Sequence, residues 1–153
     1  MQVWTFLHVV FMFAAVTLAH AAWWFVVYAT RRRDVAGLRA YERVSGLADG
    51  LSLAFLGLGI VFGVVAALTG SIDLAASWLV AAYILIGIGV VNGVASVPYA
   101  NRLAKGVREN PADDPSAELS ALMASRQPLV FALVATAVIV LIIALMVFKP
   151  TLW

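Results

Sequence analysis

Four long apolar segments constrain the fold of this chain more than any other feature of its sequence. They cover residues 4–30, 51–69, 75–100 and 128–148, and two histidines in the first are their only basic or acidic side chains. A helix needs about 20 mainly apolar residues to cross a bilayer. Because a backbone in lipid must satisfy its own hydrogen bonds, each segment predicts a helix rather than an isolated strand. The expected fold is all-α: a polytopic membrane protein whose antiparallel bundle of four transmembrane helices forms a single membrane domain, residues 1–153.

The composition supports a lipid environment. The chain is 64% hydrophobic and only 12% charged, whereas an average soluble domain is about half apolar and about a quarter charged. The absence of cysteine excludes disulfides, thiolate metal sites and a cysteine nucleophile. The net charge of +2 is small and by itself indicates nothing about partners. From the apolar composition we expect membrane lipids and no nucleic acid among the partners, and we expect no metal site.

The basic residues predict the orientation of the bundle. Nine of the ten lysines and arginines fall in two loops, residues 31–50 and 101–127, and only Lys149 falls at the opposite side. Loops rich in Lys and Arg stay in the cytoplasm. We therefore expect both loops to be cytoplasmic and both termini to lie outside.

Arginines gather at the start of the first loop. Arg31, Arg32 and Arg33 follow the first apolar segment directly. They are membrane-surface candidates that could bind anionic lipid or a partner. The alternative is a topology signal whose side chains extend to the headgroups.

Both cytoplasmic loops contain short amphipathic stretches. In the first loop the apolar residues at helical spacing are Val35, Leu38, Tyr41 and Val44. In the third, Asp114 can cap a helix that begins at Pro115, with an apolar face of Leu119, Leu122 and Met123. Each stretch predicts a short helix lying on the membrane surface.

Small residues predict how the helices pack. Gly59 and Gly63 form the Gly-x-x-x-Gly of "GIVFG", and Gly89 and Gly93 form that of "GVVNG". Glycines let helix backbones approach closely in lipid, so the second and third helices are expected to meet along these stripes, although the pattern also fits a homodimer. Asn92 is the only amide deep in a span, and it should face the bundle and bond another helix.

The two histidines, His8 and His20, are the candidate ligands for chemistry. They are 12 residues apart, about 18 Å along a helix, so they cannot share one metal ion. Haem iron takes a histidine with a second histidine or a methionine, and Met146 on the fourth helix lies at about the depth of His8. A haem b bound by His8 and Met146, or by the His8 residues of two chains, is one interpretation. The other is that each histidine is neutral and hydrogen-bonded to a neighbouring helix.

Several motifs resemble a known family. "FLHVV", the Arg-rich exit of the first helix, "LRAYERVSGLADG", "GVVAALTG", "SWLVAAYILIGIG" and "VPYANRLA" resemble a bacterial family of four-helix integral membrane proteins, domain of unknown function 2269. The likeness covers about residues 3–105 and implies the bacterial inner membrane, but no activity. The early "LH" is similar to copper-resistance D-type domains and to the haem-binding protoporphyrinogen oxidase of bacteria, which implies a ligand role for His8 alone.

Three functions follow as hypotheses. The first is a non-catalytic accessory or assembly subunit of a larger membrane complex, because the spans contain no carboxylate, lysine or arginine. The second is a b-type haem protein in electron transfer or porphyrin chemistry, with His8 as axial ligand. The third is a small-solute transporter or channel, for which the spans offer few polar residues. The expected partners are other membrane subunits or a second copy of the chain, and enzymatic activity is not favoured.

Overall fold

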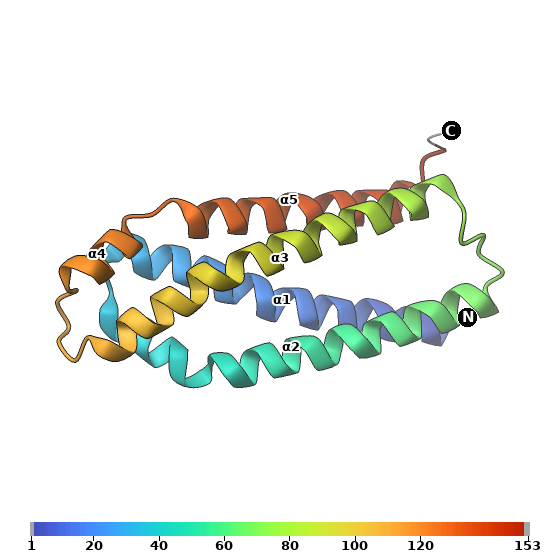
Figure 1. Cartoon of the computed structure of the whole chain (residues 1–153). Coiled ribbons are helices and arrows are strands. Elements are labelled where there is room, and N and C mark those ends of the chain that lie inside the picture. Colours follow the sequence, from blue (N-terminus) through green and yellow to red (C-terminus); the bar gives the residue numbers. More distant parts are fainter. Residues whose placement is uncertain (1, 152–153) are drawn as a thin grey trace.

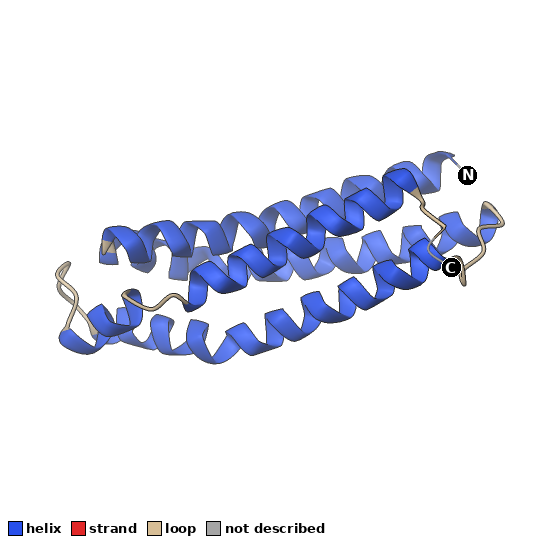
Figure 2. Ribbon diagram, turned by 90° about the horizontal axis from the view of Figure 1, so that it is seen from above, coloured by secondary structure: helices blue, strands red, loops and turns tan. Residues whose placement is uncertain are grey.

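The computed structural model describes residues 2–151, and within them every regular element is a helix (Figure 1). The helices are α1 (Gln2–Arg32), α2 (Val35–Thr69), α3 (Ser77–Glu109), α4 (Ala117–Met123) and α5 (Gln127–Phe148). Four of them run back and forth along the molecule, and both ends of the chain lie at the same end of the bundle (Figures 1 and 2). The predicted all-α bundle of four long helices is confirmed.

Four helical segments are long and apolar enough to cross a membrane. They are α1, α2, α3 and the stretch Ala117–Phe148, which joins α4 to α5. Only 11% of the most apolar window in each segment is buried inside the chain. Most of their apolar surface therefore faces outward, as expected of helices surrounded by lipid.

The first connection is much shorter than the predicted loop 31–50. Only Arg33 and Asp34 separate α1 from α2, and the Asp34 carboxylate caps α2 by accepting a 2.7 Å hydrogen bond from Gly37 N. No proline interrupts the helix from Val35 onward. The prediction of a separate surface helix is wrong, because these residues form the first turns of α2 and Val35 and Leu38 are buried in the core.

The connection between α3 and α5 also differs from the prediction. α3 continues through Pro98 to Glu109. The cap of α4 is Ser116, whose hydroxyl accepts from Leu119 N, and not Asp114. Leu119 is fully buried, so α4 packs against the bundle with its apolar face instead of lying on a membrane surface.

The helices pair in a different order from the one expected. α1 packs against α2, α3 against α5, and α1 against α5, whereas α2 and α3 barely touch. The prediction that α2 and α3 meet along their glycines is wrong. Gly59 and Gly63 approach α1, Gly89 faces Val138 of α5, and a side chain at Gly93 would meet no described atom within 4 Å.

The core of the bundle gathers at the end where α1 turns into α2. Its buried residues come from α1, α2, α3 and α4. They are Val26, Ala29, Val35, Leu38, Tyr99, Leu103, Val107, Leu119 and Met123. Tyr99 is 2% exposed, and its hydroxyl donates a 3.2 Å hydrogen bond to the carbonyl of Leu122. This end, which also holds most of the basic residues, is thus the most firmly packed part of the molecule.

Candidate functional site

His8 is fixed against α2 by a hydrogen bond and by close packing. Its Nδ1 lies 2.7 Å from the carbonyl oxygen of Gly59. Because a carbonyl oxygen can only accept, Nδ1 carries the proton. A Cβ built on Gly63 would lie 2.6 Å from the same nitrogen. Gly63 therefore leaves the space that the imidazole occupies, whereas Gly59 supplies the carbonyl oxygen and leaves space for the side chain of Met12. The sequence pattern did not reveal these roles.

His20 bonds a different helix. Its Nε2 lies 2.8 Å from Oγ1 of Thr136 in α5. That hydroxyl already donates to the carbonyl of Ala132 at 2.8 Å, so His20 Nε2 is the donor. The two histidines hence carry their protons on different ring nitrogens, and each ties α1 to another helix.

The hydrogen bond of His8 is made with α2, whereas its predicted partner Met146 belongs to α5. His8 faces α2, and His20, on a different face of α1, is the histidine that reaches α5. Met146 belongs to α5 and is 36% exposed. Among the described residues no hydrogen bond or ring contact joins it to His8, so His8 and Met146 as a pair of haem ligands stay a prediction.

Two further hydrogen bonds join the spans. The Asn92 side chain of α3 donates from Nδ2 to the carbonyl oxygen of Phe131 in α5 at 3.2 Å. The prediction that Asn92 bonds another helix is confirmed. Ser52 Oγ of α2 donates to the carbonyl oxygen of Ala15 in α1 at 3.0 Å. Polar groups in lipid are stabilised by such partners on neighbouring helices.

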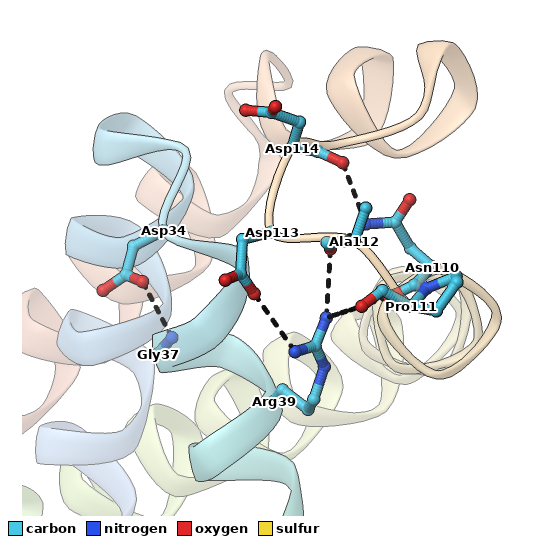
Figure 3. Close-up of polar contacts among 8 residues, drawn as sticks. All are labelled: Asp34, Gly37, Arg39, Asn110, Pro111, Ala112, Asp113 and Asp114. Carbon is cyan, nitrogen blue, oxygen red and sulfur yellow. Dashed lines mark hydrogen bonds and ion pairs between the residues drawn. The ribbon is translucent and has the colours of Figure 1, made fainter.

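Arg39 of α2 clamps the loop of residues 110–116, which joins α3 to α4 (Figure 3). Its Nη1 lies 3.2 Å from Asp113 Oδ1. Its Nη2 donates to three successive carbonyl oxygens, those of Asn110, Pro111 and Ala112, at 2.9, 3.3 and 3.1 Å. One guanidinium thus holds four acceptors of the loop in place.

Asn110 shapes the same loop from inside. Its Nδ2 donates to the carbonyl oxygens of Ala112 and Asp114 at 2.8 and 3.1 Å (Figure 3). Its Oδ1 accepts from Ser116 N at 3.2 Å. All three contacts fold the backbone around the amide, which is 8% exposed. The loop is therefore an ordered structure rather than a loose linker.

A basic pocket of about 240 Å³ lies between the end of α1 and the start of α5. We define it by three arginines, Arg31, Arg33 and Arg126, together with Thr30 and Ser125, which also line it. Sequence reasoning singled out Arg31, Arg32 and Arg33 but treated Arg126 only as an orientation signal. Arg126 directly precedes α5. The chain reverses direction at α4, and this places Arg126 in the same pocket as Arg31 and Arg33.

Arg32 lies apart from the basic pocket. Its guanidinium carbon is 5.7 Å from the centre of the Tyr28 ring, a cation–π arrangement. Arg32 is not among the residues that line the pocket. The run of three arginines therefore splits into two residues that share a pocket and one that does not.

A wider groove of about 450 Å³ opens where α2 and α3 diverge. We call it the α2–α3 groove. Small and polar residues line much of it: Ala19, Ala22, Ser45, Ser96, Ala100 and Ala104. The carboxylate residues Glu42 and Asp49 also line it, and Glu42 forms an ion pair with Arg108. Large side chains, among them Trp23, Tyr41 and Tyr99, line the rest, so the groove is mostly apolar and polar in part.

Comparison of the chain with models of protein families, with curated proteins and with solved structures gives no match. The likeness to a family of four-helix membrane proteins consequently stays a prediction from the sequence motifs. The functional conclusions below depend on the geometry of the described residues.

Proposed function

We propose that this protein is an integral protein of the bacterial inner membrane that serves as a non-catalytic accessory or assembly subunit of a larger membrane complex. In this arrangement the end of the bundle with the basic pocket faces the cytoplasm, since nine of ten basic residues lie toward it. Both termini lie on the outer side. Membership of the family of domain of unknown function 2269 is part of this proposal.

The single observation that carries the proposal is the α2–α3 groove. In lipid the hydrophobic effect does not drive helices together, so spans associate through small residues and through polar contacts. Ala100 and Ala104 of α3, with Ala19 and Ala22 of α1, offer the small surfaces. The hydroxyls of Ser45 and Ser96 donate to carbonyl oxygens of their own helices, so they offer a partner their oxygen atoms as acceptors. These are the features that favour docking of a transmembrane helix of another subunit.

The polar groups of the spans support a structural role in the same way. His8, His20, Ser52 and Asn92 each bond a neighbouring helix of the same chain. A transported solute or a reacting substrate needs polar groups that point into its path. Here these four serve instead to hold the bundle together.

Site-specific photo-crosslinking tests the proposal. Benzoylphenylalanine replaces Val97, which lines the groove, or Val140 of α5, which is 58% exposed, and the cells are irradiated before membranes are isolated. We expect Val97 to give a discrete adduct with another membrane protein and Val140 to give none. An adduct of two copies of this chain would contradict the accessory role and favour a homodimer. The absence of any protein adduct at Val97 would also contradict it.

Haem binding is a second candidate, and the tautomer of His8 favours it. A metal-ligating histidine usually donates its other ring N–H to a carbonyl or carboxylate, as Nδ1 of His8 does toward Gly59. Nε2 is then the nitrogen that would ligate iron. Since Met146 is not a described neighbour of His8, the second axial ligand would be His8 of a second copy.

An absorption spectrum separates the two candidates. Protein purified gently from haem-replete cells should show a Soret band under the haem interpretation, and His8→Ala should abolish it. His20→Ala serves as the matched control and should leave the band unchanged. A colourless wild-type protein would contradict haem binding.

A further inference from the structure

The positive charges of the basic pocket are not balanced by acidic residues in its lining. Three arginine residues and no acidic residue line it. The ion pairs of residues 2–151 involve Arg39, Lys105 and Arg108, and none of the pocket arginines takes part in one. The nearest acidic residue in sequence, Asp34, caps α2. Three like charges around one space repel one another, and an anion between them would remove that repulsion.

The pocket also offers a neutral donor and an apolar wall. Ser125 Oγ accepts a 3.2 Å hydrogen bond from Gln127 N, which leaves its hydroxyl proton available for an anion. Val27, Met123 and Leu129 line the remaining side. A ligand with a phosphate at one end and hydrocarbon beyond it would match both parts of this lining.

The backbone at Arg33 points to a role for its side chain. Its φ is 55°, in the left-handed region. The hydrogen bonds Asp34 N to Ala29 O, 2.9 Å, and Arg33 N to Thr30 O, 3.2 Å, close the end of α1 around it. Glycine is the usual residue at such a helix end because it has no Cβ to strain. The chain keeps an arginine where glycine would be less strained, and the guanidinium lines the pocket.

We propose that the basic pocket binds the phosphate group of an anionic phospholipid. Arginine matches phosphate oxygens with paired N–H donors, and pockets of this kind at the cytoplasmic ends of spans hold lipid headgroups. The proposal rests on the proposed membrane location. Free inorganic phosphate shares the chemistry, but the apolar wall of Val27, Met123 and Leu129 favours the lipid.

Native mass spectrometry of the full chain in detergent tests the site. Dioleoyl-phosphatidylglycerol is titrated against the wild type, Arg33→Gly, Arg126→Gln and the control Arg32→Gln. We expect affinity to fall about tenfold in the first two variants, the scale of one lost charge-assisted hydrogen bond. Arg32→Gln removes a charge from the same run without touching the pocket, and should change affinity less than about twofold. Arg33→Gly also relieves the left-handed backbone, so misfolding would not explain its loss of binding.

Several results would overturn the proposal. An equal loss in Arg32→Gln would mean diffuse charge attraction, and equal affinity of the wild type for dioleoyl-phosphatidylcholine would mean that anionic lipid is not selected. If inorganic phosphate at millimolar concentration displaced the lipid, the site would belong to soluble phosphate. A separate experiment tests the proposed membrane location. If alkaline carbonate without detergent released the wild-type protein from membranes, the protein would not be integral to them.

Discussion

Two side chains of α1, those of His8 and Met12, explain why Gly63 and Gly59 occur in the middle of α2. His8 rests on Gly63 and donates to the carbonyl of Gly59. The sequence correctly marked these glycines as packing residues, but small residues indicate close approach without indicating the partner. The partner helix is α1, which is joined to α2 by a turn of only two residues.

Gly63→Ala should destabilise the bundle by about 1–3 kcal/mol, the usual cost of overpacking. The new methyl group would meet the His8 ring, and the ring cannot move without breaking its bond to Gly59. The matched control is Gly57→Ala, because a Cβ there meets nothing within 4 Å. It should be neutral or stabilising by up to about 1 kcal/mol. Denaturation in detergent measures both, and equal effects would contradict the described packing.

His20 and Thr136 should be energetically coupled. Replacing either residue leaves one polar group without its partner at the contact between α1 and α5. A double-mutant cycle of His20→Ala and Thr136→Val should give a coupling free energy of about 0.5–1.5 kcal/mol, as found for hydrogen bonds between membrane helices. A coupling of zero would indicate that the two side chains do not interact.

At the scale of the elements, the helices were easier to predict than their ends and their neighbours. The four apolar segments identified the four long helices because length and hydropathy are local properties. The start of α2 at Val35 was missed, since charged residues that end an apolar run do not end a helix. The buried side of α4 was missed too, because an apolar stripe on a short helix suits a membrane surface as well as a protein core.

Arg39 should control the order of the connection between α3 and α4. Arg39→Ala removes four contacts to the 110–116 loop. Amide hydrogen exchange in residues 110–123 should then become about tenfold faster, which corresponds to about 1.4 kcal/mol of lost local stability. Arg43→Ala is the control, because Arg43 is exposed and takes part in no hydrogen bond or ion pair among the described residues. If both variants exchange like the wild type, the clamp contributes nothing.

At the scale of the whole molecule, only part of the basic pocket could be predicted from the sequence. Arg31 and Arg33 stood out as a charge run, but their partner Arg126 is more than 90 positions away along the chain. Only the return of the chain through α4 into α5 brings it to the same space. A site assembled from residues so far apart along the chain has no local signature, and the sparse contact between α2 and α3 has none either.

The placement of this pocket in the cytoplasm depends on the orientation of the whole bundle, which the chain allows to be measured cleanly. Its sequence contains no cysteine, so a single introduced cysteine is the only thiol. Ser71→Cys lies in the turn between α2 and α3, and Ala112→Cys lies in the 110–116 loop; both positions are exposed. On intact cells stripped of their outer membrane, a membrane-impermeant maleimide should label Ser71→Cys at once and Ala112→Cys only after lysis, because basic loops remain inside. The reverse pattern would put the three pocket arginines on the outer face, and the lipid they select would then have to come from the outer leaflet.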